Sequence, residues 1–171
     1  MSIKQGLVYV FTGEGKGKTS AALGVAVRAL CAGMKVGWVS WYKEKVLPTR
    51  MFLEGKLEMY AMGKGFYKLP GDKATPEEHK QAAAAALNKA GKLIKRMDVV
   101  VLDEVNNAVH DKLINLKQLT NLINKRGKTH LILTGRNACP ELVEWADLVT
   151  EMKKIKHPFD KGIKAVKGLD Y

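Results

Sequence analysis

The sequence VYVFTGEGKGKTS at residues 8–20 joins an apolar, β-prone run to a glycine-rich turn and the start of a helix. This is the layout of a phosphate-binding loop, in which glycines let backbone N–H groups converge on phosphate oxygens and the helix N-terminus adds partial positive charge. Lys18 would reach phosphate oxygens, and the hydroxyl of Thr19 would ligate Mg²⁺. The leading glycine, Gly13, comes one position later than the standard pattern requires, so the loop is one residue tighter. A glycine- and lysine-rich surface turn is the alternative, but it would not need Lys-Thr before an apolar helix.

A second nucleotide-site signature lies at DVVVLD, residues 98–103, which has the character of a buried parallel strand. Asp103 and Glu104 stand at its carboxyl end, where they can hold Mg²⁺ directly or through water. Charge at a buried strand end is costly without a cation. Together with the phosphate loop, this pair of acids predicts a Mg²⁺–nucleotide site.

Predicted strands and helices alternate along the rest of the chain. Strands are expected at 6–12, 35–41, 57–62, 98–103, 129–133 and 146–152, and helices at 19–30, 49–54, 75–96, 112–125 and 140–145. Residues 153–171 are expected to form an extended segment or hairpin at the sheet edge. The alternation predicts a three-layer α/β fold of the P-loop NTPase (RecA-like) type with a mainly parallel sheet. The 171 residues are expected to form a single domain.

The chain carries a formal net charge of +12, which suits a polyanion such as nucleic acid, an anionic membrane or a phosphorylated ligand, without choosing between them. No apolar run approaches the roughly 20 residues needed to span a bilayer, so we expect no membrane partner. Cys31 and Cys139 lack metal-like spacing, and the N-terminus shows no secretory pattern. The cytoplasm is therefore the expected location.

Three basic residues outside the phosphate loop are further candidates for the site. Arg28 breaks an apolar helix, so it is either a surface charge or a contact to nucleotide or to a partner subunit. Lys43 follows the carboxyl end of a strand, where ligands bind in α/β sheets. Arg136 ends another strand and could clamp a phosphate or stabilise the charge of a leaving group.

A set of motifs runs through the chain from end to end. The loop with its displaced glycine is followed in order by AALG (21–24), MGKGF (62–66), VLDE (101–104), TGR (134–136), ADLVTEM (146–152), KHPF (156–159), GIKA (162–165) and GLDY (168–171). In this order the motifs resemble the P-loop corrinoid adenosyltransferases, the ATP:cob(I)alamin adenosyltransferases. The tail motifs are the most specific part of the resemblance.

The resemblance implies transfer of the 5′-deoxyadenosyl group of ATP to the cobalt(I) of a reduced corrinoid such as cobalamin, with triphosphate leaving intact. It implies ATP and corrinoid as substrates, Mg²⁺ as cofactor, a homodimer, and a reductase that supplies electrons, with no nucleic-acid partner. The metal would be held by Thr19 and Glu104 with Asp103 close by, and the catalytic residues would be Lys18, Glu104 and Phe66. The expected nucleotide- and corrinoid-binding residues are Gly13, Glu14, Gly15, Lys16, Gly17, Lys18, Thr19, Ser20, Arg28, Lys43 and Arg136.

The chain departs from the family pattern on the corrinoid side. Family members often carry a tryptophan two residues after the glycine–phenylalanine step, where this chain has Lys68. Because the stretch 66–68 is altered, an alternative function is that of a corrinoid carrier without transfer activity. The high positive charge leaves open a nucleic-acid-stimulated RecA-like ATPase, in which Trp38, Trp41 and Tyr42, interleaved with lysines, would stack on bases. The alternative role for Trp38 and Trp41 is in the core, as strand residues.

Overall fold

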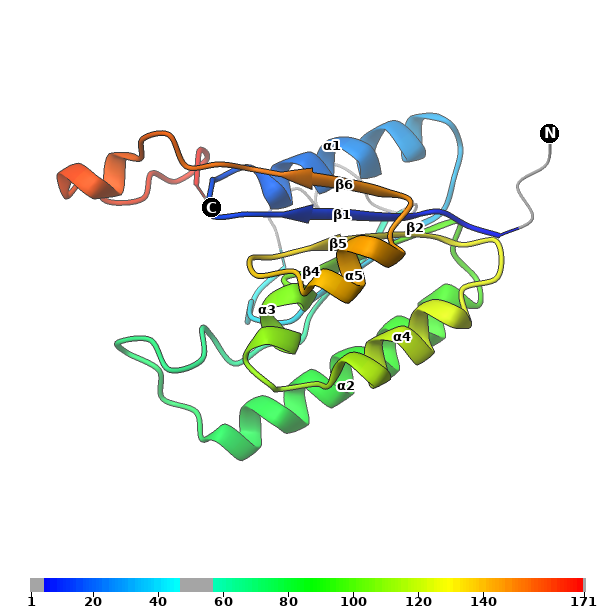
Figure 1. Cartoon of the computed structure of the whole chain (residues 1–171), viewed down its shortest axis with the longest axis horizontal. Coiled ribbons are helices and arrows are strands. Elements are labelled where there is room, and N and C mark those ends of the chain that lie inside the picture. The colour runs from blue at the N-terminus through cyan, green and yellow to red at the C-terminus, as the bar shows by residue number, and fades with distance from the viewer. Residues whose placement is uncertain (1–4, 47–56, 171) are drawn as a thin grey trace.

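A parallel sheet between two layers of helices forms the body of the protein (Figure 1). The computed structural model describes residues 5–46 and 57–170. The strands are β1 (Val8–Thr12), β2 (Val36–Ser40), β3 (Leu57–Ala61), β4 (Val99–Asp103), β5 (His130–Thr134) and β6 (Leu148–Glu151). They lie in the order β3-β2-β4-β5-β1-β6, and every neighbouring pair is parallel. The predicted three-layer α/β fold with a parallel sheet is confirmed.

The helices are α1 (Lys18–Cys31) on one face of the sheet and α2 (Pro76–Ile94), α3 (Val105–His110), α4 (Leu116–Asn124) and α5 (Pro140–Trp145) on the other (Figure 1). Because both faces are covered, β2 and β4 are buried at every position, as is usual for central strands of a parallel sheet. The α1 layer packs through small residues such as Ala22 and Ala26, which let the helix approach Trp38 and Val101 closely. Trp38 and Trp41 belong to the core, which confirms the strand-core alternative for them.

Helix α2 begins where the sequence predicts it, at a capping box. The side chain of Thr75 accepts a hydrogen bond from the backbone N–H of Glu78, and the Glu78 carboxylate accepts one from the N–H of Thr75. Pro76 occupies the first turn, where its missing N–H is not needed. Two of the free N–H groups of the helix N-terminus are thereby satisfied.

Two predictions about elements are wrong. The segment after β4 holds two helices rather than one at 112–125, because Lys112 adopts a left-handed conformation and Asn115 caps a new helix with Gln118. The tail over 153–170 forms turns and a short 3₁₀ helix (Pro158–Lys161) instead of an extended segment or hairpin, and it projects away from the sheet (Figure 1). Gly162 and Gly168 have positive φ, which bends the chain at both points. The helix expected at 49–54 lies outside the described residues.

The parallel sheet brings its carboxyl ends, and the loops that follow them, to one edge. Strand β5 lies between β1, which leads into the phosphate loop, and β4, which leads into Asp103 and Glu104. Side chains after β4 must therefore reach past the end of β5 to meet the phosphate loop. Within the described ranges, no helix is both long and apolar enough to cross a bilayer.

The capping box predicts how much the free energy of unfolding falls when the Thr75 hydroxyl is removed. Thr75→Ala is expected to lower the free energy of unfolding by about 1 kcal/mol, because the N-terminal amides of α2 lose their acceptor. Thr75→Ser, which keeps the acceptor, should stay close to the wild type. Urea unfolding monitored by circular dichroism measures both, and equal stability of the two variants would contradict the capping role.

Candidate functional site

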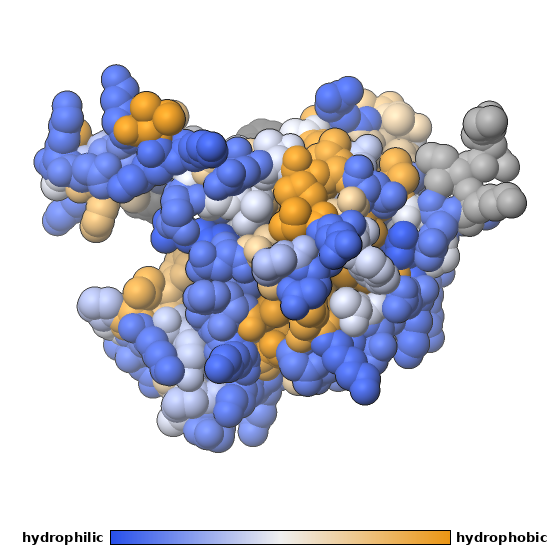
Figure 2. Space-filling view, in the orientation of Figure 1, coloured by the Kyte–Doolittle hydropathy of each residue, from blue (hydrophilic) through white to orange (hydrophobic). Residues whose placement is uncertain are grey.

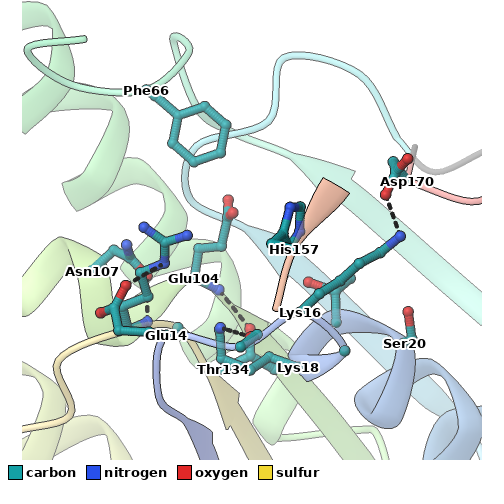
Figure 3. Close-up of a pocket in the computed structure, with 15 residues that line it drawn as sticks. Glu14, Lys16, Lys18, Ser20, Phe66, Glu104, Asn107, Thr134, His157 and Asp170 are labelled. Atoms are coloured by element: carbon teal, nitrogen blue, oxygen red, sulfur yellow. Dashed lines mark hydrogen bonds and ion pairs between the residues drawn. The ribbon is translucent and has the colours of Figure 1, made fainter. Parts of the chain in front are cut away.

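A cavity of about 330 Å³ opens at the carboxyl edge of the sheet (Figure 3). It is bounded by the phosphate loop on one side, by Phe66 on another and by the C-terminal tail on a third. Its lining residues are Glu14, Gly15, Lys16, Gly17, Lys18, Thr19, Ser20, Phe66, Glu104, Asn107, Thr134, Gly135, Arg136, His157 and Asp170. Segments from almost the whole length of the chain therefore meet here.

The phosphate loop wraps around the side chain of Lys18. The Nζ of Lys18 donates to the carbonyl oxygens of Gly13 and Gly15, at 2.7 Å each. The N–H of Gly15 donates to the carbonyl of Met152 at 2.6 Å, which ties the loop to the chain leaving β6. A Cβ on Gly13 would lie 2.5 Å from that same carbonyl oxygen, so the displaced glycine is required by close packing as well as by its φ of 95°. Burial and the charge of Arg136 lower the pKa of Lys18.

Asp103 is the buried centre beneath the cavity. Its Oδ1 accepts from the hydroxyls of Thr19 at 3.0 Å and Thr134 at 2.8 Å. Its Oδ2 accepts from the hydroxyl of Ser40 at 3.1 Å and from the Nζ of Lys43 at 2.9 Å. One carboxylate thus joins β4 to α1, β5, β2 and the loop after β2, and the cation of Lys43 offsets the cost of burying its charge.

Glu104 has the opposite character, because its carboxyl group lacks such donors. The residue is half-buried, but its Oε2 is sealed from solvent and finds no hydrogen-bond donor among the described residues. Burial, followed by the charge of Asp103, raises the pKa of Glu104 to about 7. Its φ of 65° is uncommon for a non-glycine residue, and the carboxyl group points into the cavity on the side of Phe66 (Figure 3). A buried carboxyl without donors in such a place suits a cation ligand.

The residues around Glu104 fit a magnesium ion better than a metal held by protein alone. Thr19 and Glu104 line the same cavity and offer one hydroxyl and one carboxylate. No group of three or more His, Cys, Asp or Glu side chains in the described part of the chain could hold a metal. Mg²⁺ commonly takes one or two carboxylates and completes its shell with water and phosphate oxygens. Asp103 already accepts four hydrogen bonds, one of them from the Thr19 hydroxyl, so it lies behind Thr19 as seen from the cavity.

Two cations at the rim of the cavity are paired with carboxylates of the protein. The Nε of Arg136 lies 3.4 Å from Oε2 of Glu14, and the backbone N–H of Arg136 donates to the side chain of Asn107 at 2.9 Å. The Nζ of Lys16 donates to the carboxylate of Asp170 and, at 2.8 Å, to the carbonyl of Leu169. Both ion pairs are solvent-exposed and therefore weak, so a bound phosphate chain can replace the carboxylates.

The cavity brings together most of the residues that the sequence predicts for the site: Glu14, Gly15, Lys16, Gly17, Lys18, Thr19, Ser20, Phe66, Glu104 and Arg136. Gly13 contributes its carbonyl oxygen to Lys18 without lining the cavity. Asp103 and Lys43 lie beneath the cavity as a pair and do not line it. Arg28 lies in the last turn of α1, exposed and well away from the phosphate loop at the start of that helix.

Five lining residues were missed by the sequence analysis: Asn107, Thr134, Gly135, His157 and Asp170. Thr134 and Gly135 adjoin the predicted Arg136, so their strand-end position was the available signal. His157 and Asp170 lie in the tail motifs, but no local pattern shows that the tail returns to a loop 154 residues away. Asn107 lies on α3, a helix that the sequence did not predict.

Comparison with known proteins identifies a family over nearly the whole chain. The family model described as ATP:corrinoid adenosyltransferase BtuR/CobO/CobP matches residues 4–171. The chain is 37% identical to a corrinoid adenosyltransferase of Sinorhizobium sp, over 98% of this chain and 81% of that protein. It is 38% identical to a corrinoid adenosyltransferase of Pseudomonas aeruginosa and 35% identical to one of Escherichia coli K12, each over 98% of this chain and over 85% and 87% of those proteins.

Among solved structures, the chain is similar to the flagellar accessory protein FlaH from Methanocaldococcus jannaschii. The TM-score is 0.55 at 14% identity, and the match covers 88% of this chain and 72% of the other. This likeness supports the fold alone.

The raised pKa of Glu104 predicts a pH-dependent stability. Between about pH 4.5 and pH 7 the folded protein binds this proton more tightly than the unfolded chain does, so Glu104 lowers stability as the pH rises through that window. Glu104→Gln is therefore expected to stabilise the ligand-free protein by about 3 kcal/mol at pH 8 and by little near pH 4.5.

Urea unfolding at both pH values measures this difference. Glu144→Gln removes an exposed carboxylate on α5 and serves as the control, with no comparable pH-dependent gain expected. An equal increase in the free energy of unfolding for Glu104→Gln at both pH values would contradict a raised pKa of Glu104.

Proposed function

The chain belongs to the ATP:corrinoid adenosyltransferase BtuR/CobO/CobP family, and on this premise we propose that it transfers the 5′-deoxyadenosyl group of ATP to the cobalt(I) of a reduced corrinoid, with triphosphate as the leaving group. The geometric observation that carries the proposal is that the phosphate loop and the exposed ring of Phe66 border one cavity. A nucleotide held by its phosphates at Lys18 would lie within the reach of a flat, largely apolar ring system that meets Phe66.

Stabilisation of the leaving triphosphate is the protein's main task in this reaction. Cobalt(I) of the substrate attacks C5′ of the ribose, so the bond from C5′ to the phosphate oxygen breaks and negative charge grows on the triphosphate. Lys18, Lys16 and Arg136 bring positive charge to the cavity where this group would lie. Glu14 and Asp170, now paired with two of these cations, would be displaced by phosphate oxygens.

Thr19 and Glu104 are the proposed holders of Mg²⁺. The bound ion would neutralise part of the charge that grows on the leaving group. Asp103 orients the Thr19 hydroxyl, and Lys43 balances the charge of Asp103. In this arrangement Glu104 is a ligand and not a base for water, which agrees with a reaction in which hydrolysis would waste ATP.

A homodimer, a cytoplasmic location, a single domain and an electron-supplying reductase belong to the proposal as well. Exposed apolar side chains gather along β6 (Figure 2), and a second copy could cover them together with those of α5: Val143, Trp145, Leu148 and Val149. Cys31 and Cys139 are both free thiols, which suits a reducing compartment.

The two alternative functions gain no support from the comparisons. The relatives are named for adenosyl transfer, and neither nucleic-acid stimulation nor carriage without transfer is indicated by their names. Trp38 and Trp41 are buried in the core, so they cannot stack on bases.

Spectroscopy of a reaction mixture tests the function. The protein is mixed with MgATP and chemically reduced cobalamin under anaerobic conditions, and the visible spectrum is followed for the light-sensitive cobalt–carbon product. Formation of this product at a rate that depends on protein concentration is the expected result. ATP binding without product from any reduced corrinoid would contradict transfer.

Removal of the phosphate-loop ammonium has a predictable effect on that reaction. Lys18→Ala is expected to lower the transfer rate roughly 100-fold or more, because the leaving triphosphate loses a half-buried positive charge. Lys92→Ala removes an exposed lysine from α2 and should leave the rate unchanged. Full activity of a folded Lys18→Ala protein would show that this loop does not hold the triphosphate.

A further inference from the structure

The ring of Phe66 stacks on a second aromatic residue, Tyr42, which does not line the nucleotide cavity. We propose that Tyr42 is a positioning residue of the transfer reaction: held by Asp111, it sets the tilt of the Phe66 ring at the boundary between the two substrates. The inference rests on the proposed function, because it concerns the corrinoid side of the same cavity.

The first observation is the stack between the two rings. The ring centroids of Tyr42 and Phe66 are 5.6 Å apart, with an angle of 29° between the planes. Tyr42 is buried, with 2% of its surface exposed, whereas Phe66 is 48% exposed. Phe66 therefore leans on a fixed ring and leaves much of its surface open for a ligand.

The second observation is the hydrogen bond that fixes Tyr42 itself. Its hydroxyl donates to Oδ2 of Asp111 at 2.5 Å. Burial and this hydrogen bond raise the pKa of Tyr42 above its ordinary value, so the hydroxyl stays protonated and keeps donating. Asp111 is the C-cap of α3, the short helix that starts directly after Glu104. Helix α3 thus connects Asp111, which holds Tyr42, to Glu104 on the nucleotide side of the cavity.

The third observation is the backbone pairing between the segment after β2 and the loop that carries Phe66. The N–H of Gly63 donates to the carbonyl of Lys43 and that of Gly65 to the carbonyl of Tyr42, both at 3.0 Å. A Cβ on Gly63 would lie 2.3 Å from the carbonyl carbon of Tyr42, so the two segments approach as closely as glycine permits. Phe66 follows this paired stretch directly, and its backbone has little freedom at that end.

The far end of the same loop is anchored too. Asp72 accepts hydrogen bonds from the backbone N–H groups of Lys68 and Ala74, and it pairs with the buried ring of His79 at 3.0 Å. The ring of His79 in turn meets the ring of Tyr67. With both ends of the loop held, the remaining freedom of Phe66 is the tilt of its ring, and that is what Tyr42 constrains.

Phe66 forms a wall between two cavities. Besides the nucleotide cavity it lines a second one of about 370 Å³, which is also lined by Leu69 and Pro70 of the same loop. A change of ring tilt would alter the space between the two cavities and leave the phosphate loop untouched. Loss of Tyr42 should therefore affect the corrinoid and spare ATP.

Kinetics of Tyr42→Leu, Tyr42→Phe and the control Tyr60→Phe test this separation. Tyr42→Leu is expected to lower kcat/KM for reduced cobalamin about tenfold, and Tyr42→Phe, which keeps the ring, to recover most of that loss. KM for ATP should stay within about twofold in both, because neither change touches the phosphate loop. Tyr60→Phe removes a similar tyrosine–carboxylate hydrogen bond, to Glu58 at 2.9 Å, and should change nothing.

A double-mutant cycle with Phe66→Leu shows whether Tyr42 acts through Phe66. If it does, Tyr42→Leu costs little in the Phe66→Leu background. Equal costs in both backgrounds, or a loss in Tyr42→Leu that appears in KM for ATP, would overturn the positioning role.

Fluorine NMR supplies a readout that does not depend on activity. Of the four phenylalanines, labelled with fluorine, Phe66 is assigned by its loss in Phe66→Leu. Its resonance is expected to move in Tyr42→Leu, because the ring current of the stacked tyrosine disappears, and to move little in Tyr60→Phe. An unmoved resonance would overturn the positioning role of Tyr42. A moved resonance in a protein that makes no cobalt–carbon product would contradict the proposed function but would still show that Tyr42 stacks on Phe66.

Discussion

A buried carboxylate holds the site together. Asp103 has no solvent exposure, yet it carries a charge that would be costly without partners. Four groups from separate parts of the chain donate hydrogen bonds to this carboxylate: the hydroxyls of Thr19, Ser40 and Thr134, and the ammonium of Lys43. Because the donors come from the carboxyl ends of β2 and β5, the loop after β2 and the start of α1, satisfying Asp103 fixes the relative positions of β2, β4, β5 and the phosphate-loop helix.

In this arrangement the two adjacent acids, Asp103 and Glu104, have different roles. Asp103 accepts four hydrogen bonds and has a structural role, while Glu104 has a raised pKa and a buried oxygen that finds no donor in the part of the chain that the structure describes. The first acid organises the loop, and the second is left free for a cation. On the other side of the cavity, the stack of Tyr42 and Phe66 gives an equally fixed surface of apolar character. Lys68 lies over the ring of Tyr67, and the ring that stacks on Phe66 is Tyr42, from the segment after β2.

Much of this could be predicted from local sequence because local chemistry dictates it. The glycines and Lys-Thr of the phosphate loop, the apolar run ending in two acids, and the Thr75–Glu78 capping box each specify their own structure within a few residues. Contacts between distant segments could not be predicted in this way. The pairing of Lys16 with Asp170, the support of Phe66 by Tyr42, and the donors that Asp103 collects from β2 and β5 depend on strand order, which alternation of strands and helices leaves undetermined. Helix α3 is too short to give an apolar period that the sequence would reveal, and α4 begins at Leu116 rather than at residue 112 because Asn115 caps it.

The central claim is that this phosphate loop serves a leaving triphosphate instead of a γ-phosphate that is transferred to water. Phosphorus-31 NMR of the products tests it most directly, in a reaction with MgATP and reduced cobalamin followed to completion. One intact triphosphate for each adenosylated corrinoid, with little inorganic phosphate, is the expected result. Stoichiometric phosphate and ADP, formed whether or not the corrinoid is present, would contradict it and identify the protein as a hydrolase.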